Sequence, residues 1–195
     1  MRSIWKPVVQ TTGATHSAVK WGDTKLMSEV LTHDDLVFRA TRWLRNTQRC
    51  GVVVPELVSY ANENPDVVGW RKQGMESILV ECKASRRDFL ADKKKAVRQT
   101  AHRGMGDLRY YFTGVGVVRT DELPERWGLA EVHGRRIHVI KQAERVKYDH
   151  RQGQIMMYSL LRRAECKGLL RQCLSAKWGG DDDFNSGTRP YAETA

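Results

Sequence analysis

The stretch that decides the fold runs from Pro65 to Lys83 and reads PDVVGWRKQGMESILVECK. Its apolar run at 78–80 predicts a short buried strand. Side chains along a strand alternate between its two faces, so Glu81 and Lys83 are expected on the same face. A turn at 72–74 would pair this strand antiparallel with the strand-like run that Asp66 begins. Asp66 would then lie close to Glu81, and two acids and one amine would meet at the edge of a sheet.

Such a trio suits the hydrolysis of a phosphodiester bond. Two carboxylates can bind Mg²⁺ or Mn²⁺, which prefer oxygen ligands and also bind phosphates. The metal can polarise a phosphoryl oxygen and lower the pKa of a bound water. The neighbouring lysine can orient that water or balance charge on the phosphorus. The alternative is a surface ion pair on an edge strand, but the apolar residues before Glu81 favour a central strand and a functional site.

The pair Pro65-Asp66, followed after fourteen residues by Glu81-Cys82-Lys83, resembles the signature of the PD-(D/E)XK nuclease superfamily. The longer string from Glu81 to Lys95 and the segment from Glu122 to Leu129 resemble a branch of MmcB-like DNA repair proteins and related phage proteins. This resemblance covers roughly residues 32–142. It implies an α/β fold with a restriction-endonuclease-like αβββαβ core, in which helices flank a mixed central sheet.

The same resemblance implies a Mg²⁺- or Mn²⁺-dependent nuclease, acting most readily on DNA, in bacterial or phage DNA metabolism or repair. Asp66 and Glu81 would bind the metal and Lys83 would position the attacking water. Glu56, in a Glu-Leu pair that MmcB-like sequences also carry, is a further metal candidate, although a solvated edge glutamate is an equal alternative. Asp35 is the acid of the first helix, but as the N3 residue of a Thr32 capping box it already has a structural role. Glu63, in a turn, is expected to be solvated.

Local patterns predict the other elements. A helix begins at Thr32, and a β-branched strand at 52–54 is restricted to a sheet edge by Pro55. A second helix begins at Ser85, and one strand is expected from Tyr110 to Val118. Trp127 is expected to pack under a loop. A hairpin then spans 129–140, and a helix spans 152–174 with a possible break at Gly168.

The second helix is strongly basic. Such a run is usually a solvated face, but beside the predicted site it is also placed to meet phosphates. The residues expected to bind nucleic acid are Arg86, Lys93, Lys94, Lys95 and Arg98.

Composition agrees with a polyanionic partner. The 195 residues carry a formal net charge of +10 and a pI of about 9.7, which favours nucleic acid or an anionic surface. No segment resembles a signal peptide or a membrane span, so no membrane partner is expected. The four scattered cysteines indicate reduced thiols, and the expected location is the cytoplasm of a bacterium or an infected host.

The expected organisation is an irregular N-terminal arm at 1–31, a nuclease-like core at 32–142, a helical extension at 143–178 and a disordered tail at 179–195. Two rival functions remain on the same fold. One is a non-catalytic nucleic-acid-binding module, and the other is a regulator that binds a protein. The sequence leaves open DNA or RNA, and a duplex, single-stranded or branched substrate.

Overall fold

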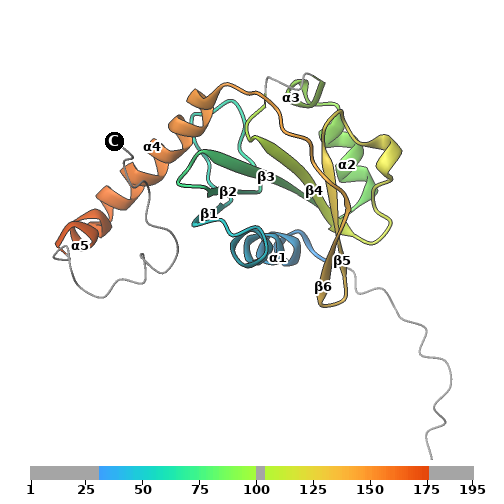
Figure 1. The fold of residues 1–195 in the computed structure, drawn as a ribbon, viewed down its shortest axis with the longest axis horizontal. Coiled ribbons are helices and arrows are strands. Elements are labelled where there is room, and N and C mark those ends of the chain that lie inside the picture. The colour runs from blue at the N-terminus through green and yellow to red at the C-terminus, as the bar shows by residue number, and fades with distance from the viewer. Residues whose placement is uncertain (1–30, 100–103, 176–195) are drawn as a thin grey trace, which may run out of the picture.

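A computed structural model describes residues 31–99 and 104–175 of the chain (Figure 1). The predicted tail, and the predicted arm apart from residue 31, lie outside the described residues. The elements, in chain order, are α1 (His33–Asn46), β1 (Val52–Pro55), β2 (Val67–Arg71), β3 (Glu76–Lys83), α2 (Arg86–Lys93), α3 (Ala96–Gln99), β4 (Leu108–Gly114), the 3-10 helix η1 (Thr120–Glu122), β5 (Gly128–His133), β6 (Arg136–Lys141), α4 (His150–Cys166) and α5 (Leu169–Ser175).

The strands form one open, mixed sheet in the order β1-β2-β3-β4-β5-β6. β1, β2 and β3 form an antiparallel meander, β3, β4 and β5 are parallel, and β6 pairs antiparallel with β5. The parallel connection from β3 to β4 passes through α2 and α3, as parallel strands require a crossover. The predicted α/β class, with a mixed central sheet flanked by helices, is therefore confirmed, and β1 with Pro55 lies at the predicted edge.

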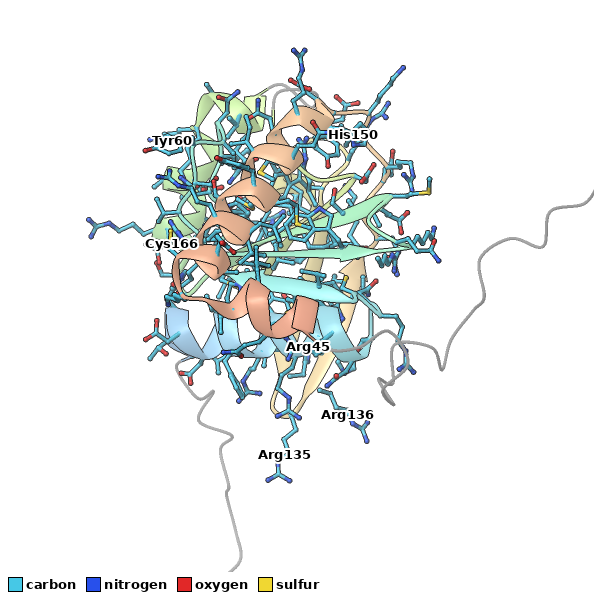
Figure 2. All side chains as sticks on the ribbon, turned by 90° about the vertical axis from the view of Figure 1, so that its left-hand side faces the viewer. Arg45, Tyr60, Arg135, Arg136, His150 and Cys166 are labelled. Carbon is cyan, nitrogen blue, oxygen red and sulfur yellow. The ribbon has the colours of Figure 1, made fainter. Side chains whose placement is uncertain are left out.

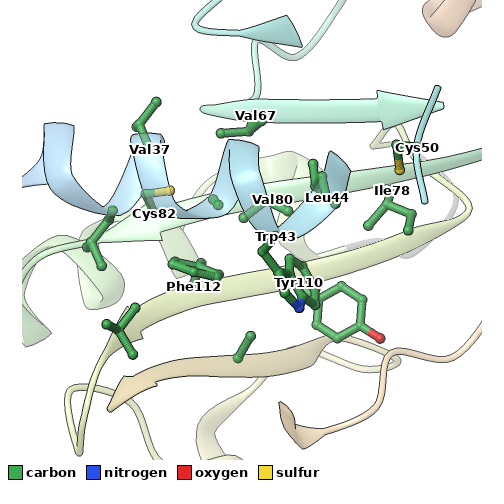
Figure 3. Packing of buried hydrophobic residues seen from close by; sticks show 14 residues of the cluster. Val37, Trp43, Leu44, Cys50, Val67, Ile78, Val80, Cys82, Tyr110 and Phe112 are labelled. Carbon is green, nitrogen blue, oxygen red and sulfur yellow. The ribbon is translucent and has the colours of Figure 1, made fainter. Parts of the chain in front are cut away.

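Helix α1 covers one face of the sheet (Figures 1 and 3). The predicted capping box begins it: the Thr32 hydroxyl accepts from the backbone N–H of Asp35, and the Asp35 carboxylate accepts from the backbone N–H of Thr32. Trp43 of α1 packs edge-on against the ring of Tyr110 at 5.3 Å. The alternate residues Ile78, Val80 and Cys82 of β3 belong to the same core cluster.

The opposite face of the sheet has a second core, and this face carries the candidate site. Phe89 of α2 packs edge-on against Tyr111, and Trp127 stacks on the other side of Tyr111 at 4.6 Å. Met156 of α4 is fully buried in the same cluster. The prediction that Trp127 packs under its loop is confirmed.

Several boundaries differ from the sequence prediction. The basic segment after Ser85 forms two short helices rather than one, because the chain turns at 94–95. Strand β4 ends at Gly114, so the residues at 115–118 form a turn instead of extending the strand. Helix α4 begins two residues earlier than expected, at His150, and the break at Gly168 is confirmed by a φ of +70°. All four cysteines are free, as expected.

Within the described ranges, no helix combines the length and the apolar character needed to cross a bilayer.

Gly128 offers a test of how closely β4, β5 and the following segment pack. A Cβ built on Gly128 would overlap the ring of Tyr110 and lie 2.7 Å from the backbone nitrogen of Ala143. Because two sides are crowded, Gly128→Ala is expected to reduce the free energy of unfolding by about 1–3 kcal/mol. Urea denaturation measures this loss. The control is Gly51→Ala, where a Cβ meets no atom within 4 Å and the change should stay within about 0.5 kcal/mol. Equal effects would contradict the prediction.

Candidate functional site

The pairing of β2 with β3 brings the predicted trio together. Val67 lies opposite Val80 in this antiparallel pair, so the preceding Asp66 lies beside Glu81. The Asp66 carboxylate accepts a hydrogen bond from the backbone N–H of Cys82 at 2.7 Å and lies 3.4 Å from Lys83 Nζ. The convergence expected from the hairpin is therefore confirmed.

Lys83 Nζ lies at the centre of a group of buried carboxylates. It donates to Glu81 Oε2 at 2.8 Å, and Asp92 Oδ1 lies 3.6 Å away. Together with Arg98 and its partners these residues form the Lys83 cluster, which we define as Glu63, Asp66, Glu81, Lys83, Asp92 and Arg98. It lies on the face of the sheet opposite α1, because Glu81 and Lys83 alternate along β3 with Val80 and Cys82 of the α1 core.

Arg98 holds the cluster together from inside. Its side chain is only 1% exposed and makes ion pairs with Glu81 at 2.9 Å, with Asp92 at 2.7 Å and with Glu63. Its guanidinium also lies over the ring of Trp127, 4.8 Å from the centroid. The expectation that Arg98 belongs to the exposed basic side of the predicted second helix is therefore wrong. Four carboxylates surround Arg98 and Lys83, and this pairing offsets the cost of burying the two positive charges.

Two acids of the cluster were missed or misplaced by the sequence prediction. Asp92 of α2 accepts from the Tyr111 hydroxyl at 2.8 Å and pairs with the exposed Lys95 at 2.6 Å. Its position three residues after the buried Phe89 is the signal that could have identified it, since such residues share a helix face. Glu63 was expected to be solvated, but it is buried and accepts from the backbone N–H of Met105 at 2.9 Å. No local pattern distinguishes it from a solvated loop glutamate.

Burial and charge shift the protonation of the cluster in opposite directions. Burial raises the pKa of Glu81 to about 7, although Arg98 and Lys83 both act to lower it. For Lys83, burial alone would lower the pKa, but the charges of Glu81 and Asp66 outweigh it and the pKa is raised. Lys83 is therefore a fixed positive charge and hydrogen-bond donor at neutral pH. A general base would need the opposite shift.

Solvent reaches the cluster at Asp66. The Asp66 side chain is 22% exposed, and beside it lie His33, whose Nε2 is 3.9 Å from Asp66, and Glu56, 3.6 Å from the same nitrogen. Glu56 is 59% exposed and has a positive φ of 47°, and its backbone N–H donates to the carbonyl of Asp66. Glu56 therefore lies at the rim and not among the buried carboxylates. Asp35 has the capping role described for α1.

The donor set suits a hard cation only in part. Mg²⁺ commonly binds proteins through one or two carboxylates and keeps several waters, and Asp66 and Glu81 supply two carboxylates in a cluster with more acids than buried cations. Among the described residues, however, no group of three His, Cys, Asp or Glu side chains has a metal-binding geometry. Both oxygens of Glu81 already face cations, Lys83 on one and Arg98 on the other. A metal bound by Glu81 would have to replace one of these contacts.

The remaining residues predicted to contact nucleic acid lie around α2. Lys94, the C-cap of α2, is exposed, Lys95 pairs with Asp92, and Lys93 is half-buried. Arg86 makes a two-point ion pair with Glu122, whose N–H···O distances are 2.8 and 2.5 Å. Lys95 thus joins the exposed end of α2 to the cluster, whereas Arg86 connects α2 to η1.

No family model and no curated protein matches the chain. Among solved structures, the fold is similar to that of SPO1766, a protein of unknown function from Silicibacter pomeroyi, with a TM-score of 0.53. The two sequences are 23% identical, and the match covers 74% of this chain and 95% of the other. At this identity the similarity supports the α/β fold alone.

Proposed function

We propose that the protein is a metal-dependent nuclease that hydrolyses phosphodiester bonds, most readily in DNA, in bacterial or phage DNA metabolism or repair. One observation carries the proposal: Lys83 Nζ lies within 3.4 Å of both Asp66 and Glu81, at a point where Asp66 is open to solvent. The resemblance of Pro65-Asp66 and Glu81-Cys82-Lys83 to the PD-(D/E)XK signature supports the same chemistry.

Each residue of the site has a distinct task in this proposal. A divalent ion held by Asp66 and Glu81 would supply Lewis-acid activation of the scissile phosphate and of water. Lys83, held positive by its carboxylate neighbours, donates a hydrogen bond to the attacking water and offsets negative charge that develops on the phosphorus. Arg98 is a positioning residue, because it fixes the orientation of Glu81 and Asp92 without reaching solvent.

The choice of nucleic acid as substrate rests on charge. The chain has a net charge of +10, and Lys94 and Lys95 are exposed at the end of α2, where Lys95 pairs with Asp92 of the cluster. Lys and Arg contacts to phosphates supply most of the sequence-independent affinity of proteins for DNA. Lys95 is held by Asp92, so its approach to phosphate is coupled to the cluster.

A non-catalytic nucleic-acid-binding module is the second candidate. It is favoured by the contacts of Glu81, whose two carboxylate oxygens are satisfied by Lys83 and Arg98 without any metal. In such a protein the cluster would only stabilise the fold.

Cleavage by the Asp66→Asn variant tests the proposal. The change keeps the size of the side chain and an oxygen that can accept from Cys82, but removes the negative charge. Cleavage of labelled DNA and RNA in Mg²⁺ or Mn²⁺ is expected to fall at least about 100-fold, since metal activation supplies several kcal/mol to the transition state.

The control is Asp121→Asn, which removes an exposed surface acid that pairs with the exposed Arg119. It should cleave like the unchanged protein, and EDTA should stop cleavage by both. Absence of cleavage of every substrate by the unchanged protein, together with salt-dependent binding, would select the non-catalytic module. Metal-independent cleavage that survives Asp66→Asn would reject the proposed site.

A further inference from the structure

A concave surface lies outside the Lys83 cluster, between α4 and the loop that joins β1 to β2. The groove has a volume of about 530 Å³, which is within the usual range for ligand sites. Its lining residues come from residues 58–60 of the loop and from the second half of α4 with its C-cap, and they include Tyr60, Tyr158, Arg162, Arg163 and Lys167. Figure 2 shows α4 crossing the front of the molecule, with Tyr60 and Cys166 toward the same side.

The groove presents flat rings and positive charge to solvent. Tyr60 is 89% exposed and Tyr158 is 67% exposed, whereas tyrosine side chains are on average partly buried. Arg162, one helical turn after Tyr158, and Lys167, the C-cap of α4, also line the groove, and both are exposed. The residues that line the groove include no Asp or Glu. Such a surface is complementary to a ligand that is anionic and also carries flat rings.

The walls of the groove are held in place. Arg163 donates a hydrogen bond to the carbonyl of Val58, and the backbone N–H of Asn62 donates to Gln152 Oε1 at 2.9 Å. On its other side α4 is anchored by Met156, which is fully buried in the second core. The tyrosines therefore project from fixed positions, so little ordering of the backbone is needed on binding.

We propose that this groove binds a single strand of nucleic acid, with bases stacked on Tyr60 and Tyr158 and phosphates bound by Arg162 and Lys167. Aromatic platforms beside cationic side chains are the features by which proteins bind single strands without sequence preference. In a duplex the faces of the bases are already stacked on each other and are not available to the tyrosines. An acidic peptide would satisfy the cations but would leave the two exposed rings without a partner.

The loop between β1 and β2 contributes residues both to the groove and to the Lys83 cluster. Glu56 and Asp66, at the two ends of the same loop, lie at the mouth of the cluster, and Glu56 is two residues from Val58. Two residues of extended chain span at most about 7 Å. A nucleic-acid strand held in the groove would lead toward Asp66. If the proposed nuclease function holds, on which this step rests, the substrate class is single-stranded or frayed nucleic acid.

Fluorescence anisotropy in EDTA, where metal-dependent cleavage is absent, tests the groove. The probes are a labelled single-stranded oligodeoxynucleotide, an oligoribonucleotide of the same length and a blunt DNA duplex. The unchanged protein should bind the single strands more tightly than the duplex. Tyr60→Ala and Tyr158→Ala should each weaken single-strand binding about 5- to 100-fold, since stacking on one aromatic ring has an effect of this size. Tyr60→Phe should retain binding, because the ring and not the hydroxyl is required.

A charge-matched pair of double variants gives the control. Arg162→Ser with Lys167→Ser should lower the log–log salt slope of single-strand binding by about 1.4, or about 0.7 for each phosphate contact. Arg135→Ser with Arg136→Ser removes two positive charges at the β5–β6 turn, which Figure 2 shows well away from Tyr60 and Cys166. This control should leave the slope unchanged.

Tyr60 and Tyr158 are exposed, so melting temperatures should not change. Equal slopes for the two double variants, a preference for the duplex, or unchanged binding by both alanine variants would overturn the proposal. Single-strand binding that depends on the tyrosines, without cleavage in Mg²⁺, would support the groove and reject the nuclease function. Metal-dependent cleavage at an unchanged rate in Tyr60→Ala and Tyr158→Ala, together with unchanged single-strand binding, would support the nuclease function and reject the groove.

Discussion

Lys83→Met is expected to reduce the rate of metal-dependent cleavage by at least about 100-fold. Removal of one preorganised hydrogen-bond donor from an active site has an effect of this size. The ammonium group of Lys83 lies within 3.6 Å of Glu81, Asp66 and Asp92. Methionine fills most of the same space but cannot donate to a water or balance charge on phosphorus. Initial rates on labelled DNA in Mg²⁺ measure the loss.

The matched control is Lys72→Met. Lys72 is also paired with a glutamate, Glu76, but it is exposed and lies in the β2–β3 turn. Its variant should cleave at the unchanged rate. Mn²⁺ binding should persist in Lys83→Met, because lysine is not a ligand and its removal leaves the carboxylates more negative. Cleavage by Lys83→Met at the unchanged rate would show that the cluster has no part in catalysis.

Arg98→Met is expected to have the largest effect on stability. It leaves Glu63, Glu81 and Asp92 with much less positive charge in a buried environment. Removing one partner of a buried ion pair costs about 3–5 kcal/mol, which corresponds to a fall in melting temperature of about 6–20 °C for a chain of this size. Thermal and urea denaturation measure the loss. Arg119→Met, which breaks the exposed pair with Asp121, should leave the melting temperature nearly unchanged, because ion pairs in solvent add little to stability.

The pH dependence of this defect provides a second measurement. Burial already raises the pKa of Glu81 from its ordinary value of 4.5 to about 7, and loss of Arg98 raises it further. A carboxyl group with a raised pKa in the folded state binds a proton more tightly there than in the unfolded chain. The contribution of this carboxyl group to the free energy of unfolding is therefore most favourable below its pKa in the unfolded chain, and it is lost as pH rises through its pKa in the folded protein. The defect of Arg98→Met should shrink between pH 8 and pH 6. A defect that grows over this range would contradict burial of an unpaired carboxylate.

The sequence could predict the trio because its geometry is local. Asp66, Glu81 and Lys83 belong to two strands joined by a short turn, so alternation and antiparallel pairing are enough to place them together. The same holds for the Thr32 capping box and for the break at Gly168. These features depend on spacings of a few residues, which hydrogen bonding and sterics fix without reference to the rest of the fold.

The buried partners of the trio depend on contacts that local patterns do not specify. Arg98 and Glu63 are 35 residues apart in the chain and meet only because α3 turns back over the loop before β2. A run of lysines and arginines indicates a solvated face on average, and only the folded structure shows that Arg98 is buried among carboxylates. The groove of Tyr60 and Tyr158 was not predicted for the same reason, since the hydrogen bond from Arg163 to Val58 spans 105 residues.

The turn between β2 and β3 also limits how this protein can change by insertion and deletion. Lys72, Gln73 and Gly74 all have positive φ, and their conformation sets the pairing of the two strands. A slip of β3 by one residue would move every side chain of the strand to the other face. Glu81 and Lys83 would then enter the apolar core beneath α1, and Val80 and Cys82 would replace them at the site. Length changes in this exposed turn should therefore be tolerated only when they preserve the register, so a surface loop is as restricted in evolution as the buried site it aligns.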